Sequence, residues 1–212
     1  MISKRLKYIA SFVDDSDYVL DIGTDHAYLP IYLIKNKITS IADGSDISEK
    51  VLQNAKENII KHNLESKINL YLSDGLNEID VTKYNTLIIT GMGFYTIKEI
   101  LNRNLLISIN KLIIQSNNNV DEMRKYLNSI NFKIISDKYI FDKNKPYSII
   151  TAVKGKQRLS KIEYICGIYD KDNIEYYKFM HDKLNDILLG IKNGANKKIK
   201  KEIKYYSKYL SK

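Results

Sequence analysis

The stretch Val19-Leu20-Asp21-Ile22-Gly23-Thr24-Asp25-His26-Ala27 decides the fold class of this chain. An apolar run of strand length, residues 18–22, stops at Gly23, and residues 27–35 then return to helical spacing with Pro30 in the first turn. A strand that turns through glycine into a helix places backbone N–H groups at the crevice beyond the sheet, where open α/β sheets bind ligands. The stretch therefore predicts an α/β fold with a ligand site at residues 21–27.

The same alternation of strand and helix continues on both sides of this stretch. Ser3 is expected to cap a short helix ahead of it. Further strands are predicted over 39–43, 67–72, 84–90, 111–115, 132–141 and 146–153, and further helices over 48–62, 94–102 and 120–130. The last two strands are joined by the turn Asp142 to Lys145 and predict an antiparallel hairpin. We expect a doubly wound, mostly parallel sheet that ends in this hairpin.

The β pattern stops near residue 157, and two helical patterns follow. Apolar residues recur at intervals of three and four in both, which is the seam of a coiled-coil hairpin. The seam residues are Tyr177, Met180, Leu184, Ile187 and Ile191, then Ile199, Ile203, Tyr206 and Leu210. Asn193-Gly194 between them is a helix stop. The sequence therefore predicts two domains, residues 1–156 and a helical domain over 157–212.

Most of the net charge of +9 lies in the last quarter of the chain. Residues 156–212 hold 14 Lys and Arg against 7 Asp and Glu, and Lys197, Lys198, Lys200, Lys201 and Lys204 form the densest cluster. A near-neutral body with a basic tail is typical of a protein that binds a polyanion, so these lysines are the predicted nucleic-acid contacts. A merely solvated helix face is the alternative.

The remaining composition narrows the class of protein. No apolar run approaches a membrane span or a signal peptide, so we expect a cytoplasmic protein without membrane partners. Cys166 is the single cysteine, which excludes an internal disulfide, and three scattered histidines show no metal-ligand spacing. We expect no metal, and a monomer rather than a dimer, although the pattern leaves open whether the tail dimerises.

The acids in the glycine turn indicate the kind of cofactor. Asp25 stands where a dinucleotide fingerprint needs its second glycine, so a pyrophosphate would meet a negative charge there. S-adenosylmethionine carries a sulfonium and an ammonium, which the carboxylates of Asp21 and Asp25 complement.

Acids and glycines at the other strand ends complete the predicted cofactor site. Asp46 lies 25 residues after Asp21, close to the spacing at which an acid binds ribose hydroxyls, and Asp43 is the competing candidate. Asp74 could accept from an adenine amino group, with Gly75 allowing the turn. Gly91-Met92-Gly93 leaves room for a flat base beside the methyl group, or is simply a tight turn.

These motifs, in order, resemble the TrmK family of bacterial tRNA (adenine 22-N1)-methyltransferases. The resemblance rests on Ser3-Lys4-Arg5-Leu6, Asp21 to Pro30, Asp74-Gly75-Leu76, Gly91-Met92-Gly93 and Ile113-Ile114-Gln115, and covers residues 2–153. It implies a class I (Rossmann-like) methyltransferase fold, S-adenosylmethionine as donor and tRNA as acceptor. The family usually has glycine where this chain has Phe94, which stacks on the target base or packs on its helix.

The acceptor side of the site is expected to work by positioning. Adenine N1 already carries a free lone pair, and it becomes accessible only when the nucleotide is unpaired or swung out and held. The resemblance supports Arg5, His26 and Tyr28 as residues of that pocket. Asp25 could stabilise the methylated base, and either Asp25 or His26 could take the N6 proton.

Two other functions stay open from the sequence. A methyltransferase acting on a small molecule or a protein would not need the basic tail. A nucleic-acid-binding protein without catalysis would be expected to have lost a cofactor acid, yet Asp21, Gly23 and Asp46 are all present.

Overall fold

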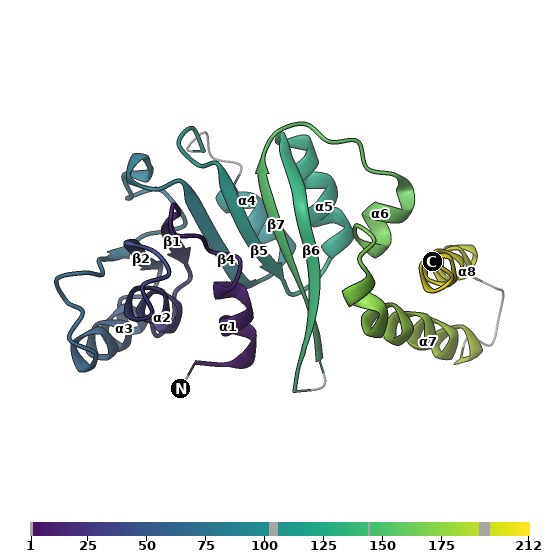
Figure 1. The fold of residues 1–212 in the computed structure, drawn as a ribbon, viewed down its shortest axis with the longest axis horizontal. Helices are drawn as coiled ribbons and strands as arrows, with labels where there is room; N and C mark the ends of the chain where they lie inside the picture. Colours follow the sequence, from purple (N-terminus) through teal and green to yellow (C-terminus); the bar gives the residue numbers. More distant parts are fainter. Residues whose placement is uncertain (1, 102–105, 144, 191–195) are drawn as a thin grey trace.

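The computed structural model describes residues 2–101, 106–143, 145–190 and 196–212 (Figure 1). Within them seven strands form one sheet in the order β3-β2-β1-β4-β5-β7-β6. The strands are β1 Tyr18–Ile22, β2 Ile41–Asp46, β3 Leu70–Leu72, β4 Thr86–Met92, β5 Lys111–Ser116, β6 Phe132–Asp142 and β7 Lys145–Lys154. The first five pair in parallel, and β7 pairs antiparallel with both of its neighbours, β5 and β6. The predicted α/β fold and its terminal hairpin are confirmed.

Helices cover both faces of the sheet, which explains why its central strands are apolar at successive positions. Ile88 of β4 packs toward α1 and α2, whereas its neighbours Leu87 and Ile89 pack toward α4 and α5. Figure 1 shows α1 in front of the sheet and α4 and α5 behind it. The helices of the body are α1 Lys4–Ala10, α2 Tyr28–Lys35, α3 Glu49–Lys61, α4 Phe94–Leu101 and α5 Val120–Ser129.

Three strands differ from the predicted bounds by two residues or more at an end, and the fourth strand is one of them, since it spans Thr86–Met92 rather than 84–90. The second strand begins at Ile41 rather than 39 and runs to Asp46 rather than 43. The third begins only at Leu70, because the N–H groups of Lys67 and Ile68 bond the Leu64 carbonyl in a turn, at 2.9 and 3.1 Å. The shift in β2 places Asp46 at the carboxyl end of its strand and Asp43 in the middle.

The described part of the tail, residues 157–212, contains three α-helices, α6 Lys161–Cys166, α7 Ile174–Gly190 and α8 Lys197–Leu210, and one short 3-10 helix, η2 Lys171–Asn173. Sequence analysis missed α6, although Ser160 and Glu163 form a capping box at its start. The tail core gathers around the buried side chains of Tyr177, Leu184, Tyr206 and Tyr209. Ile187, which the pattern puts in the seam, is 43% exposed, and Ile191 with Asn193-Gly194 lies outside the described residues.

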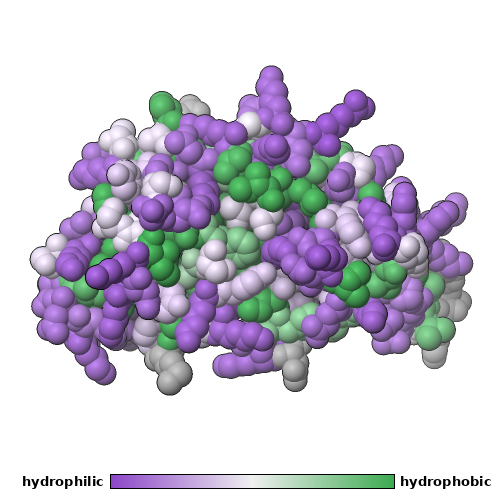
Figure 2. All heavy atoms as spheres, viewed as in Figure 1, coloured by the Kyte–Doolittle hydropathy of each residue, from purple (hydrophilic) through white to green (hydrophobic). Residues whose placement is uncertain are grey.

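The two long tail helices, α7 and α8, lie side by side (Figure 1) and share one apolar core. Seam residues of both helices belong to this core: Tyr177, Met180 and Leu184 of α7, and Ile199, Ile203, Tyr206 and Leu210 of α8. Figure 2 shows hydrophilic side chains over most of this end of the molecule.

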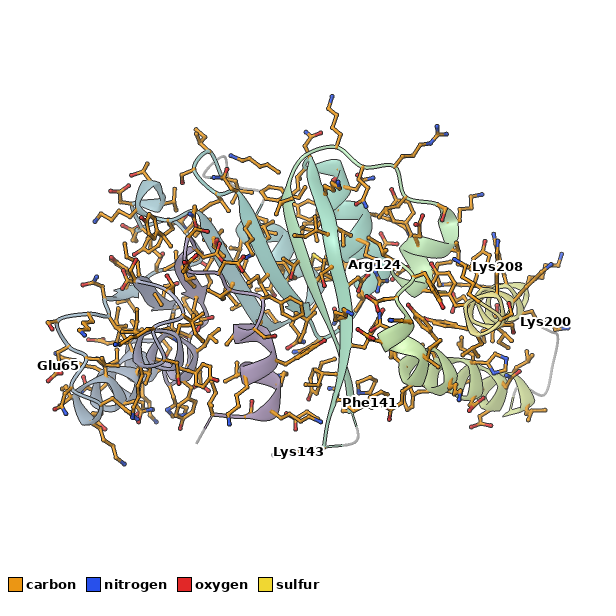
Figure 3. The ribbon with its side chains drawn as sticks, viewed as in Figure 1. Glu65, Arg124, Phe141, Lys143, Lys200 and Lys208 are labelled. Carbon is orange, nitrogen blue, oxygen red and sulfur yellow. The ribbon has the colours of Figure 1, made fainter. Side chains whose placement is uncertain are left out.

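A buried charge joins the tail to the body. Arg124 of α5 is 1% exposed, and its Nε donates to Asp137 Oδ2 of β6 at 2.7 Å. Its Nη1 donates to the Tyr164 and Ile165 carbonyls of α6, at 2.9 and 3.2 Å. Tyr139 of β6 stacks on Tyr176 of α7 with ring centroids 3.4 Å apart. Figure 3 places Arg124 between the sheet and the tail helices.

No helix in the described part of the chain is long and apolar enough to cross a membrane. Nor do these residues bring three or more His, Cys, Asp or Glu side chains together as metal ligands.

Candidate active site

The site begins at Asp21, a buried carboxylate near the carboxyl end of β1. Its Oδ2 accepts a hydrogen bond from the Thr24 hydroxyl at 2.8 Å. Burial raises the pKa of the Asp21 carboxyl to about 7; the Thr24 bond opposes this rise, and the negative charge of Asp46 adds to it. A cation bound beside Asp21 would therefore stabilise the ionised form of this carboxyl.

The Gly23 turn is shaped for close approach. Its φ of +74° is in the left-handed region, and a Cβ there would lie 2.3 Å from Cε of Met92. The N–H groups of Gly23 and Thr24 both bond the Ser45 carbonyl, at 2.8 and 2.9 Å, which ties the turn to β2. The positive φ therefore favours glycine here, and a larger residue would also have to displace the end of the Met92 side chain.

One cavity, of about 140 Å³, lies on the β2 side of Gly23. Asp46, Asp74 and Gly75 line it together with Met92, as the sequence predicted for a cofactor site. The side chain of Asp46 also caps the turn that leads into α3, because its Oδ1 accepts from the Ser48 N–H at 2.9 Å.

Asp43 does not line either cavity described here. Its Oδ1 accepts from the Asn69 N–H at 2.8 Å, and its Oδ2 from the Tyr84 hydroxyl at 2.6 Å. These bonds hold Asp43 inside the sheet layer, so of the two competing acids the geometry favours Asp46.

A second cavity, of about 240 Å³, lies on the α1 side of the same glycine. It is lined by all but one of the residues predicted for the acceptor side, and also by Asp21 and Gly91, which the sequence predicted for the cofactor. Those predicted residues are Arg5, Asp25 and Tyr28. Gly23 and its neighbours thus separate two cavities that open at one end of the sheet.

His26 is the residue predicted for the acceptor side that lines neither of these cavities. Its Nε2 lies 3.5 Å from Asp25 Oδ1, and its ring packs against Tyr28 at a centroid distance of 5.2 Å. Asn58 of α3 fixes the backbone here by donating to the His26 carbonyl at 3.0 Å. Asp25 and Tyr28 are themselves exposed, as groups that meet an incoming substrate must be.

The Gly91-Met92-Gly93 turn is held by three side-chain amides, one near the end of β5 and two just after it. Gln115, fully buried, accepts from the Gly91 N–H through Oε1 at 3.2 Å. Asn117 donates to the Gly91 carbonyl at 2.6 Å, and Asn118 accepts from the Phe94 N–H at 2.9 Å. Gly93 lines neither described cavity but packs near Asn118.

Sequence reasoning assigned no role to these amides. Gln115 also accepts from Nη1 of Arg5 at 3.2 Å, so it connects the turn to α1 across the sheet. A buried glutamine at the carboxyl end of a strand was the available signal, because a buried amide needs specific partners.

Phe94 packs in the core. It is 6% exposed, and its ring lies edge-on to Tyr126 of α5 at 6.4 Å. Of the two roles that the sequence left open, the geometry favours packing.

The lysine cluster of the tail lies on α8, and all five of its side chains are exposed. Lys198 has a neighbouring carboxylate, Glu202, at 3.9 Å, and Lys201 lies over the Tyr205 ring at 5.8 Å. Figure 3 shows Lys200 and Lys208, on the same helix, pointing away from the body.

Comparisons with known proteins agree with this geometry. A family model described as a methyltransferase domain matches residues 2–150. The tRNA (adenine(22)-N(1))-methyltransferase of Bacillus subtilis is 31% identical over 156 residues, which cover 73% of this chain and 66% of that enzyme, just under two thirds of its length.

Two solved structures extend the match to the tail. TrmK of M. capricolum, solved with S-adenosyl-homocysteine, is 32% identical with a TM-score of 0.84, covering 100% of this chain and 98% of that one. A Streptococcus pneumoniae protein solved with S-adenosyl-L-methionine is 30% identical with a TM-score of 0.88, covering 99% of this chain and 100% of that one.

Proposed function

The chain belongs to the TrmK family of tRNA (adenine 22-N1)-methyltransferases, and on that premise we propose that it methylates N1 of adenine 22 in tRNA, using S-adenosylmethionine. The observation that carries the proposal is the pair of cavities on either side of Gly23, one lined by Asp46 and Asp74 and the other by Asp21 together with the predicted acceptor residues. When bound, S-adenosylmethionine supplies an electrophilic methyl group.

The residues present fit this donor. Asp46 is placed to accept from ribose hydroxyls, and Asp74 with Gly75 to meet the adenine edge. Asp21, which lines the second cavity, supplies a buried carboxylate for the ammonium group, and burial raises the pKa of this carboxyl. Met92 lines the first cavity, and Gly23 lines both.

The acceptor cavity orients the base. Adenine N1 attacks through its own lone pair, so the protein contributes position and charge rather than activation of a nucleophile. Tyr28 offers a ring on which a swung-out base stacks, with His26 packed behind it. Methylation leaves a positive charge on the purine, which Asp25 stabilises, and either Asp25 or His26 accepts the N6 proton.

The two parts of the chain divide the work. Residues 1–156 hold the donor and the target base, and residues 157–212 hold tRNA through Lys197, Lys198, Lys200, Lys201 and Lys204. Among these five lysines, Lys198 has a carboxylate partner, Glu202, and the ion pairs of the described residues include none of the other four. The protein is proposed to act as a cytoplasmic monomer.

The test is methylation of a tRNA transcript with tritiated donor, followed by mapping of the modified nucleoside. We expect 1-methyladenosine in a transcript with adenine at position 22 and no incorporation when that adenine is replaced by guanine. Incorporation at other positions, or into small molecules or protein but not tRNA, would reject the proposal.

A further inference from the structure

The β6–β7 hairpin projects beyond the end of the sheet at which the active site lies. β7 pairs with β5 only over its last part, with Ile150 opposite Ile114 and Val153 opposite Lys111. The rest of β7 pairs with β6 alone, down to the Asp142–Lys145 closing pair. Figure 1 shows the hairpin running well past the ends of β4 and β5.

Packing on both sides holds the projecting hairpin in place. On one side Ile140 joins the cluster that contains Ile9 and Ala10 of α1. On the other side Phe141 packs edge-on against Phe179 of α7, with ring centroids 5.5 Å apart. Figure 3 shows Phe141 directed toward α7 and Lys143 at the tip. The hairpin is therefore a fixed wall between α1 and the tail.

Two cations converge on one ring of this wall. Cζ of Arg5 lies 4.8 Å from the centroid of the Tyr147 ring, and Nζ of Lys145 lies 5.4 Å from the same centroid. Neither Arg5 nor Lys145 forms an ion pair within the part of the chain that the structure describes. Their contacts are a neutral ring and, for Arg5, the amide oxygen of Gln115.

The positive charges of Arg5 and Lys145 are therefore available to bind an anion. A guanidinium has five N–H donors, and the described contacts of Arg5 use one of them. The ring and the amide orient the two cations without neutralising them. Arg5 also lines the acceptor cavity, so an anion bound here lies beside the substrate.

We propose that Arg5, Lys145 and Tyr147 form a phosphate-binding notch for the RNA backbone next to the target nucleotide. A nucleotide that leaves its stack carries its flanking phosphates to the mouth of the pocket, where Arg5 and Lys145 bind them. This inference rests on the proposed function, because it names the contact that the body makes while the tail holds tRNA elsewhere. The hairpin thereby joins the acceptor cavity to the tail along a single surface.

The test compares Lys145→Gln with Lys133→Gln, an exposed lysine at the opposite end of the same hairpin. Affinity for the tRNA transcript is measured at several salt concentrations. A plot of log affinity against log salt concentration has a negative slope, and each lost phosphate contact makes this slope less steep by about 0.7 to 0.9. We expect this loss in Lys145→Gln, with on the order of five- to tenfold weaker binding at 0.1 M salt, and an unchanged slope in Lys133→Gln. Equal slopes in the two variants would overturn the proposal.

A second variant separates RNA phosphate from the carboxylate of the methyl donor as the partner of Arg5. Arg5→Gln is expected to lower the salt slope for tRNA while calorimetry gives an unchanged affinity for S-adenosylmethionine. Loss of donor affinity with an unchanged tRNA slope would assign Arg5 to the donor and overturn the notch.

Failure of the proposed function gives a different result. If the wild-type protein binds tRNA but does not methylate it, the proposed activity is rejected, while the salt slopes of the variants still test the phosphate-binding notch. If the wild-type protein does not bind tRNA, both proposals fail.

Discussion

Replacing Arg124 by Met is expected to destabilise the protein by about 3 to 5 kcal/mol, the typical cost of removing one partner from a buried ion pair. The Asp137 side chain is 0% exposed, and Arg124 Nε donates to its Oδ2 at 2.7 Å. Without the guanidinium, that carboxylate stays buried with the Ser148 hydroxyl at 3.4 Å as its remaining described side-chain donor. The Tyr164 and Ile165 carbonyls lose a donor as well. A domain of ordinary stability, about 5 to 15 kcal/mol, loses a large share of it.

Urea unfolding followed by circular dichroism measures the effect, with Lys125→Met as the control. Lys125 is the next residue of α5, and its Nζ lies 2.6 Å from Glu122 Oε1, but both side chains are nearly half exposed. Solvent screens that pair, so its loss should cost at most about 1 kcal/mol. An Arg124→Met variant as stable as Lys125→Met would refute the assignment of the buried pair as the joint between body and tail.

Three further changes test the site. The affinity for S-adenosylmethionine should rise about tenfold per pH unit as pH approaches 7 from below, because the pKa of Asp21 is raised to about 7 and its carboxyl must lose a proton to pair with an ammonium. Calorimetry in buffers of different ionisation enthalpy should show that proton being released when the donor binds. An affinity that does not change with pH would contradict this role of Asp21. Asp46→Ala should weaken donor binding by about 1.5 to 3 kcal/mol per lost ribose bond, whereas equal affinity in variant and wild type would remove Asp46 from the ribose. Phe94→Leu should lower thermal stability slightly and leave turnover on tRNA unchanged, since the ring is buried against Tyr126; a selective fall in turnover at full stability would return Phe94 to the base.

The strand ends show how much of the site the sequence predicts. Asp21, Asp46 and Asp74 each follow a run of strand residues, and parallel strands bring their carboxyl ends to one edge, so their convergence is predictable. The choice between Asp43 and Asp46 was not, because it depends on where β2 begins. That start is set by the Thr39 hydroxyl, which bonds the Asp17 and Ile41 carbonyls, and no local pattern records this contact.

Other features depend on partners distant in the chain. Gln115 meets Arg5 across 110 residues, and only the folded sheet brings them together. The tail helices follow from their apolar spacing, but their packing depends on how Arg124 and Tyr139 of the body fit against them. The heptad pattern therefore predicted the helices, while the exposure of Ile187 is a property of the assembled tail.

The stacked pair Tyr139 and Tyr176 provides an optical reporter for the joint between body and tail. The chain has 17 tyrosines and no tryptophan, so its intrinsic fluorescence comes from tyrosine alone. Burial raises the pKa of both hydroxyls of this pair, which lie within the joint, and protects them from alkaline ionisation. Detachment of the tail would expose both hydroxyls to solvent, and their pKa values would return to the ordinary range for tyrosine. An alkaline absorbance titration can therefore follow the attachment of the tail without labels.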